Sequence, residues 1–449
     1  METPQETPME RPPALTASQI RRRLDFLTVL AYGLMESGQT SSQVEPVVRR
    51  TAVALGVDNL GFNAFGRILL IDTTRGDGST SSVSGAARGL DMIDCTRARA
   101  LQDVAMGLVQ AATSADTAEL AVEARLDAAK DRVDRLRESA TPWWLSMGGL
   151  TMLAFFISMQ VGVSWQAWVS AALVQLASSL MGAATGAVRM PKLFATAVQG
   201  CTSGALATVL VLVGFVDPVG AAAAIAVSWL ILVPLPQVIG AVSDAIASDF
   251  VSAMTRTASL LVAVISLTIA GAFTFMLGEV LHMEHPRLDE LPSFPWYLVL
   301  VFCALGAVAN AFANGGRLPL VLPAAGLGLV TGAVNQALLI GAGLPTLWAN
   351  SLAAVVLGAL AAFYAVRSGY PQQVLALMGF TGALMPGIPV FFGILQLMGG
   401  GQGMSSFAEA AAICVGIGTG VGLGAYPVDV VRRHRRGTDA WLHRFGARA

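Results

Sequence analysis

Ten residues at positions 384–393, LMPGIPVFFG, combine two prolines with two glycines. They lie within an apolar segment of about residues 371–398, which exceeds the roughly 20 residues that a helix needs to cross a bilayer. Proline and glycine interrupt helices, and a helix broken at membrane depth is tolerated only where protein or trapped water satisfies the freed backbone groups. We therefore interpret this stretch as the break in a discontinuous membrane-spanning helix.

A related cluster, VPLPQ, stands at positions 233–237 in another apolar segment about 150 residues earlier. Two proline-interrupted spans at corresponding places in two halves of a chain are a good sequence indication of a transporter binding site. The candidate substrate-binding residues at the two breaks are Pro234, Pro236, Gln237, Pro386, Gly387 and Pro389.

The composition separates a water-soluble part from a membrane part. The 449 residues have a mean hydropathy of +0.63 and only 13% charged residues, which is typical of membrane proteins. Charged residues are concentrated in the first 140 residues, whereas the only charged residues at positions 143–216 are Arg189 and Lys192. The net charge of −1 gives no reason to expect a nucleic-acid partner. Four cysteines scattered singly match no zinc site or disulfide framework, and we expect no metal and no cofactor.

The first 140 residues predict a small α/β domain. Positions 1–17 are rich in Pro, Glu and Thr without an apolar signal core, so a disordered tail is expected. Within the domain at 18–140, periodicity predicts helices at about 18–36, 42–55, 91–110 and 116–138, with strands within 59–73 and 80–86. Ser41 or Ser42 with Glu45 is the expected capping box of the second helix. The highly charged fourth helix is either a stalk that couples the domain to the membrane or simply a solvated surface.

The remaining sequence predicts a mainly α-helical polytopic membrane protein with ten transmembrane helices. The spans are expected near 143–162, 165–187, 193–214, 219–239, 257–278, 294–314, 318–340, 345–366, 372–397 and 405–426. They form a first half at 141–281, an external loop at 282–293, a second half at 294–427 and a basic cytosolic tail at 428–449.

Basic residues predict the orientation, because they are enriched in cytoplasmic loops. The loops with Arg189 and Lys192, Arg256, Arg317 and Arg367 fall on the same side as the basic tail. We therefore expect a multi-pass protein of the cell membrane with both termini in the cytoplasm.

We interpret the two halves as a repeat. Because each half has an odd number of spans, five, the second half must be inverted in the membrane relative to the first. The broken span is the fourth in each half: Pro218 precedes Pro234 by 16 residues, and Pro371 precedes Pro386 by 15. Chance placement of prolines at span ends is the alternative. A broken helix exposes N–H groups on one side and carbonyls on the other. A zwitterionic amino acid suits these groups, and another small polar solute is not excluded by them.

Polar residues elsewhere in the spans provide further candidates. Asn310 and Asn314 are one helical turn apart, and either bind substrate or serve as interhelical hydrogen bonds. Asp244 and Asp249 follow the first break, with Arg256 further on. These three either couple transport to protons or are ordinary solvated charges of a cytoplasmic loop. Alternate glycines at positions 416–424 place two glycine faces on the last span, which suits packing between two neighbouring helices.

Several of these segments resemble the threonine/serine exporter family. In the head, LMESGQTSSQVE (34–45) and ALG (54–56) are similar to the family's opening, as is Pro234 followed by AIASD (245–249) and Arg256. Pro371 followed by MPGIP (385–389) is similar to its smaller C-terminal membrane module. In the family's order, these motifs cover the chain from about Arg22 to Tyr426.

The resemblance implies a proton-driven exporter of L-threonine and L-serine with a cytosolic N-terminal domain. It also implies that Asp244, Asp249 and Arg256 are the family's polar positions after the first break. Leu235 departs from the family's Pro-Gly pattern, which leaves the substrate open. The implied partners are a small amino acid, the proton and the lipid bilayer, with homo-oligomers left open. We expect no enzyme, the alternative being a sensor or hydrolase on a membrane anchor.

Overall fold

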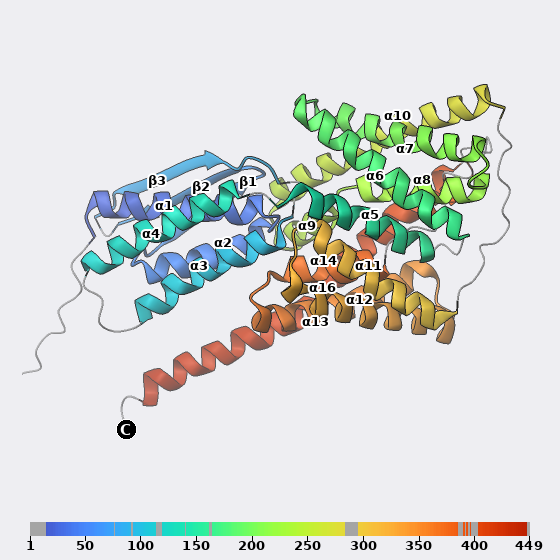
Figure 1. Ribbon diagram of the computed structural model, residues 1–449. Helices are drawn as coiled ribbons and strands as arrows, with labels where there is room; N and C mark the ends of the chain where they lie inside the picture. Colours follow the sequence, from blue (N-terminus) through green and yellow to red (C-terminus); the bar gives the residue numbers. More distant parts are fainter. Residues whose placement is uncertain are drawn as a thin grey trace, which may run out of the picture.

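The computed structural model describes residues 15–75, 77–90, 93–113, 119–139, 141–160, 164–282, 295–384, 389–390, 392–393, 396 and 403–446. A head built from the first 139 residues lies at one end of a larger bundle of helices, the body (Figure 1). The predicted tail at 1–14 and external loop at 283–294 lie outside the described residues.

The head is the predicted α/β unit. Its helices are α1 (Ala17–Glu36), α2 (Ser41–Ala54), α3 (Cys95–Thr113) and α4 (Glu119–Glu138). Its strands β1 (Leu60–Phe65), β2 (Ile68–Thr74) and β3 (Thr80–Ala86) form one antiparallel sheet in the order β1-β2-β3. Ile71 at the centre of β2 lies opposite Phe62 on one side and Val83 on the other.

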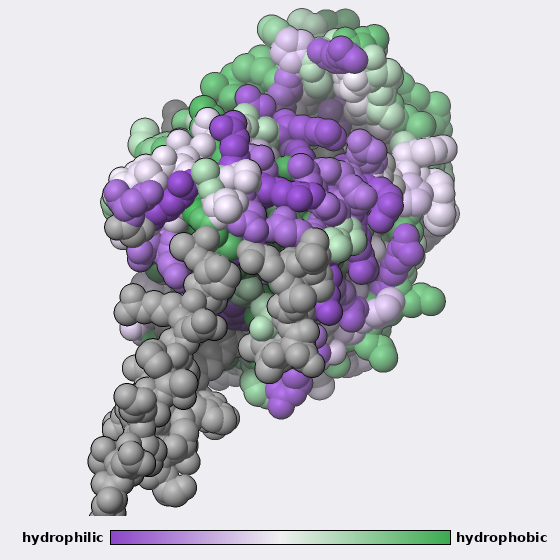
Figure 2. Space-filling model, turned by 90° about the vertical axis from the view of Figure 1, so that its left-hand side faces the viewer, coloured by the Kyte–Doolittle hydropathy of each residue, from purple (hydrophilic) through white to green (hydrophobic). Residues whose placement is uncertain are grey.

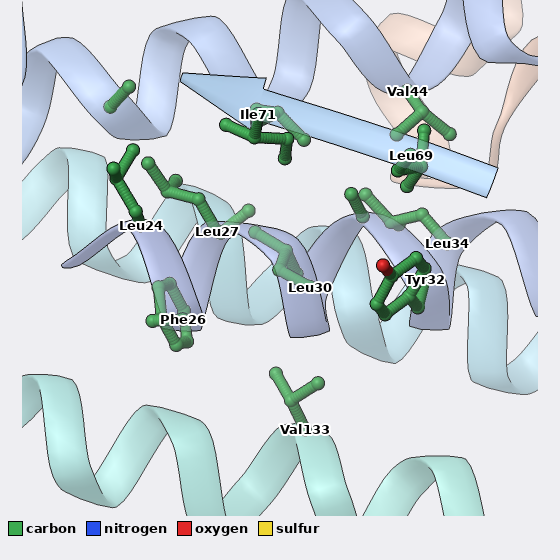
Figure 3. Packing of buried hydrophobic residues seen from close by; sticks show 14 of the residues in the cluster. Leu24, Phe26, Leu27, Leu30, Tyr32, Leu34, Val44, Leu69, Ile71 and Val133 are labelled. Atoms are coloured by element: carbon green, nitrogen blue, oxygen red, sulfur yellow. The ribbon is translucent and has the colours of Figure 1, made fainter. Parts of the chain in front are cut away.

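Helix α1 is the centre of the head. Its apolar residues recur every three or four positions, so Leu24, Leu27 and Leu30 share one face and are fully buried. Side chains of β2 and α4 close over this helix, including Ile71 and Val133 (Figure 3). A capping box in which Thr16 and Gln19 exchange hydrogen bonds begins the helix.

The first half of the body contains six helices. They are α5 (Trp143–Gln160), α6 (Trp165–Ala187), α7 (Lys192–Leu212), α8 (Pro218–Leu232), α9 (Leu235–Ile246) and α10 (Phe250–Val280). The described helices of the second half are α11 (Trp296–Ala313), α12 (Leu318–Gln336) with the π-helical turn η1 (Ala337–Gly341), α13 (Thr346–Ser368), α14 (Gln372–Ala383) and α16 (Met404–Gly446).

Within the described residues, seven helices are long and apolar enough to cross a membrane, or up to nine if each of two bent pairs is one span. One bent pair is α8 and α9, which meet at 45°, and the other joins part of α4 to α5. The protein is therefore a multi-pass membrane protein. The count of ten is not reached, in part because the predicted span at 372–397 runs beyond α14 into residues outside the described set.

Two of the element boundaries that differ from the sequence prediction involve basic residues. Helix α10 begins at Phe250 rather than near 257, which places Arg256 inside a helix and not in a loop. Helix α16 continues without a break to Gly446 and extends from the body on the side of the head (Figure 1). The basic tail predicted at 428–449 is therefore a continuation of α16 as far as Gly446 and not a separate segment.

The two halves pack their helices in the same order. In the first half α5 packs on α6, α6 on α7 and α8, and α7 on α8 and α10. In the second half α11 packs on α12, α12 on α13 and α14, and α13 on α14 and α16. Helices α5 and α11 also pack on each other. Each contact in the first set thus has a counterpart in the second.

The glycines of α16 allow close approach to two neighbours, as the sequence predicted. A Cβ on Gly424 would lie 1.8 Å from the carbonyl oxygen of Val355 in α13. A Cβ on Gly418 would lie 2.8 Å from Val242 in α9. The two glycine faces are therefore packing surfaces, one for each neighbouring helix.

The molecular surface changes character from head to body. The end of the molecule formed by the head is largely hydrophilic, and hydrophobic residues appear towards its edges (Figure 2). On the body, large apolar side chains face outward on many helices, among them Trp165 (58% exposed) and Leu322 (82% exposed). An outward apolar surface of this kind suits contact with lipid.

Candidate functional site

The break between α8 and α9 follows from its prolines. Pro234 and Pro236 have no N–H, so they cannot donate to the carbonyls of Leu230 and Leu232 four residues before them. The N–H of Leu235 donates to Val233 O at 2.8 Å instead of continuing the helix. The carbonyl end of α8 is thus freed from its own helix at the bend.

The start of α9 offers fewer free donors. Pro236 has no N–H, and the N–H of Gln237 donates to Pro234 O at 2.8 Å. The first break therefore presents carbonyl oxygens rather than N–H groups. Carbonyls at the end of a helix favour a cation such as an ammonium group.

One face of α9 holds a buried charged cluster. Gln237, Gly240 and Asp244 are three and four residues apart and so share that face. Arg256 of α10 lies across it, donating from Nε to Asp244 Oδ2 at 2.8 Å and from Nη1 to Gln237 Oε1 at 3.0 Å. Asp244 is 0% exposed and Arg256 3%.

Gly240 makes room for this arrangement. A Cβ on Gly240 would lie 2.9 Å from Nη1 and 3.0 Å from Cδ of Arg256. Any larger residue would require the guanidinium to shift relative to its two partners on α9.

The head completes the cluster through residues 38–42, which we call the α1–α2 junction. The Ser41 hydroxyl lies 2.5 Å from Asp249 Oδ2 and 3.1 Å from Asp244 Oδ1, so it can donate to either carboxylate. Ser42 reaches Asp244 Oδ1 at 3.4 Å. Arg256 Nη2 donates to the carbonyl oxygen of Gln39 at 3.4 Å. Hydroxyl and carbonyl groups of the head are thus partners of the charged groups of the body.

Two further hydrogen bonds fix the head to both halves of the body. Gln373 of α14 accepts from the Thr40 N–H at 3.1 Å and donates to Pro236 O at 3.4 Å. Gln237 donates from Nε2 to the carbonyl of Leu90. Gln373 therefore connects the junction, the first break and the second broken span.

Two sequence predictions at this site are wrong. Ser41 and Ser42 do not cap α2, whose N-cap is Thr40 without a side-chain cap hydrogen bond. The charged carboxylates of the body are the stronger acceptors, and Ser41 is turned towards them. The interpretation of Asp244 and Arg256 as solvated loop charges is also wrong, since both are buried and paired. Asp249 is partly buried and caps α10 through the N–H of Ser252 at 3.1 Å.

The second break can be described only in part. Pro386 and Gly387 lie outside the described residues, whereas Pro389 is helical and buried. Val390 packs against an apolar cluster to which α8 contributes, and Leu235 of α9 shares another cluster with α14 residues. Helices α9 and α14, one from each half, are in contact.

Buried amides contact α8 in the first half and the end of α14 in the second. Gln175 of α6 accepts from Ser228 of α8 at 3.0 Å. Asn350 of α13, which accepts from Asn335, donates to Leu384 O at the end of α14 at 3.5 Å. Both Gln175 and Asn350 are at most 4% exposed.

Asn310 and Asn314 are hydrogen-bonded to each other. Asn310 donates to Leu377 O of α14 at 3.1 Å, and Asn314 donates to Asn310 Oδ1 at 2.8 Å. The bond to Leu377 is an interhelical hydrogen bond, and substrate binding by the two asparagines stays a prediction. The sequence did not point to Gly240, Gln373 or a role for Ser41. Only the spacing of Gly240 between Gln237 and Asp244 gives a signal, since helix docking between distant segments leaves no local pattern.

Comparison with known proteins agrees with this arrangement. A family model described as "ThrE: Putative threonine/serine exporter" matches residues 25–278 and 282–426. Neither the curated proteins nor the solved structures contain a match to the chain. The family match spans the head, both halves of the body and every residue of the buried cluster. Because the family model covers most of the length of the chain, the chain belongs to the ThrE family.

Proposed function

We propose that the protein exports small hydroxylated amino acids, L-threonine and L-serine, across the cell membrane in exchange for protons. Membership of the ThrE family supports the transport of these substrates. The observation that carries the mechanism is the Asp244–Arg256 ion pair, which is buried at the end of a proline-broken membrane helix. Ionisable groups at such positions are costly to bury and are typical of coupling and substrate sites.

The first break is proposed to bind the substrate ammonium. Its freed carbonyl oxygens at the end of α8 suit a cation, and Pro234 and Pro236 are the residues that free them. The substrate carboxylate is then assigned to the second break, where Pro386, Gly387 and Pro389 interrupt the other span. Gly387 has no side chain that could shield a backbone N–H, whereas the N–H groups of Leu235 and Gln237 at the start of α9 already donate to Val233 and Pro234.

Asp244 is proposed as the proton carrier, with Arg256 as its partner. An ionised Asp244 is stabilised by the guanidinium, and protonation removes that attraction. Arg256 would then depend more on Gln237, which stands next to the break. A proton on Asp244 is thereby able to change the groups beside the substrate, which is the requirement for exchange.

The membrane architecture is proposed to be an inverted repeat of five spans with both termini in the cytoplasm. The matching packing order of the two halves supports the repeat. The basic loops support the orientation. The head then lies in the cytoplasm, where substrate for export is available.

Transport by the purified protein in proteoliposomes tests this function. A pH gradient should drive movement of radiolabelled L-threonine against its concentration gradient, and a protonophore should abolish it. L-valine serves as the control substrate, because it has nearly the shape of threonine without the hydroxyl. Equal transport of valine would contradict the hydroxyl preference, and transport of unrelated polar solutes instead would support the alternative of a different exporter.

A further inference from the structure

We propose that the α1–α2 junction is a built-in occupant of a cytosolic recognition site for hydroxylated amino acids. In the described structure Ser41 holds the site closed, and the substrate must replace it before export. This inference rests on the proposed function, and it assigns to the head a role that the transport mechanism above does not use.

The site lies apart from the first break. Asp244 follows Pro234 by ten residues, which corresponds to about 15 Å along a helix. The Asp244–Asp249 pair therefore lies at the C-terminal end of α9, and the break lies at its N-terminal end. The inference places the substrate at the two carboxylates before it reaches the break.

The junction presents the chemical groups that the substrate itself carries. Its Ser41 hydroxyl lies between Asp249 Oδ2 at 2.5 Å and Asp244 Oδ1 at 3.1 Å. Its Gln39 carbonyl oxygen accepts from Arg256 Nη2 at 3.4 Å. Serine and threonine likewise carry a hydroxyl donor and, in their carboxylate, an oxygen acceptor. The two carboxylates and the guanidinium can therefore bind either the junction or a free hydroxylated amino acid.

The junction closes the buried part of this site. Gln39 and Thr40 are 0% exposed and Ser41 3%. Asp244 is also 0% exposed, whereas Asp249 is partly exposed, so a solute reaches Asp244 only when the junction moves. A substrate cannot bind the carboxylates while Ser41 occupies them. Substrate binding at the carboxylates and occupancy of the site by the junction are thus mutually exclusive.

The closed arrangement also leaves polar groups unsatisfied. Gln39 Nε2, Gln43 Oε1 and Ser252 Oγ are buried without a hydrogen-bond partner in the part of the chain that the structure describes. A buried polar group without a partner costs free energy that hydration would recover. These three groups favour withdrawal of the junction and make the closed state one of two accessible states.

Labelling of a cysteine in the junction tests the inference. Gln39 is replaced by cysteine in the full-length chain, with the four native cysteines changed to alanine. This substitution keeps Ser41 and the backbone carbonyl that binds Arg256. Inside-out vesicles are treated with a membrane-impermeant maleimide, and denatured samples report the total thiol. L-threonine and L-serine should accelerate labelling, whereas L-valine should not.

A second variant removes the contact of Ser41 itself. Ser41→Ala deletes hydroxyl donation to a charged acceptor, which corresponds to about a tenfold shift in an equilibrium or more. Labelling at position 39 without substrate should rise by about that factor. Ser84→Ala, an exposed serine of β3, is the matched control and should leave the rate unchanged.

Labelling and threonine transport are measured on the same vesicles. The inference would be overturned if the vesicles transport threonine but the labelling rate changes neither with threonine nor with Ser41→Ala. That result would leave the proposed function intact. Failure of the vesicles to transport threonine or serine would instead overturn the proposed function. Rapid labelling of Gln39→Cys that Ser41→Ala does not increase would show that the junction does not close the site.

Discussion

Arg256 donates from Nε to Asp244 Oδ2 across 2.8 Å, and neither side chain is more than 3% exposed. The two residues come from α10 and α9, on either side of the turn that contains Asp249. This ion pair is the feature that joins the broken span, the following span and the head into one site.

Removing one charge of this ion pair should destabilise the protein more than removing both charges. Asp244→Asn leaves a buried guanidinium without its counter-charge, which costs about 3–5 kcal/mol. The double variant Asp244→Asn with Arg256→Met removes both charges and should recover a large part of that loss. Thermal unfolding in detergent measures the stabilities. A direct pairing would be contradicted if the double variant lost more stability than the two single variants lose in sum.

Gly240→Ala should disturb the site without changing any charge. The added Cβ would lie 2.9 Å from Arg256 Nη1, so the guanidinium must shift, and we expect its hydrogen bond to Gln237 or Asp244 to weaken. We expect transport to fall about tenfold or more, in line with the loss of one charge-assisted hydrogen bond. Gly326→Ala in α12 is the matched control, because a Cβ there meets no atom within 4 Å. Equal activity of the two variants would show that Gly240 has no special role.

Gly424→Ala should weaken the packing of α16 on α13. Its Cβ would lie 1.8 Å from Val355 O, and rigid backbone cannot yield as a flexible side chain can. Forcing the helices apart should cost about 1–3 kcal/mol, as overpacking does elsewhere. The thermal unfolding midpoint reports this cost. Gly186→Ala, which meets no atom within 4 Å, should leave the midpoint unchanged.

The head should show an acid-sensitive contribution from Glu36. Burial alone would raise the pKa of Glu36, but hydrogen bonds from Arg137 at 2.9 Å and 3.0 Å and from the Arg88 N–H at 2.8 Å outweigh it and lower the pKa. Because the folded pKa is the lower one, this stabilisation is complete above the unfolded pKa of about 4.3. It is lost as the pH falls through the folded pKa.

Glu36→Gln should therefore lower stability at pH 7 and flatten its decline at acidic pH. The expected loss at pH 7 is about 1–3 kcal/mol, because hydrogen bonds to a charged acceptor are replaced by neutral ones. Unfolding of the full-length chain between pH 3 and pH 7 measures both effects. Glu138→Gln, at the exposed end of α4, is the control. A stability curve parallel to that of the natural chain would contradict the assignment.

Local features of the fold were predictable from the sequence. The apolar period of α1 and the alternate glycines of α16 each depend on residues close in the chain, and the structure bears them out. The bend at Pro234 was also predictable, because proline removes a backbone donor wherever it stands. The span count and the course of the chain at Pro386 and Gly387 stay predictions.

Long-range relationships were not predictable from one sequence. The contact between Ser41 and Asp249 joins residues 208 positions apart, and the local pattern at Ser41 indicated a helix cap instead. Asn310 is a second case: the sequence left open whether it binds substrate or another helix, and the structure adds a hydrogen bond to Leu377 of α14. Burial and partner decide such roles, and both depend on how the head docks on the body.

The most direct test of the central claim is L-threonine transport against its gradient in proteoliposomes with an imposed pH gradient. The natural chain should accumulate threonine, and Asp244→Asn should abolish the dependence on the pH gradient while the folded protein is retained at reduced temperature. Asp58→Asn, an exposed carboxylate of the head, should transport as the natural chain does. Proton-driven threonine transport that survives Asp244→Asn would contradict the role of the buried ion pair.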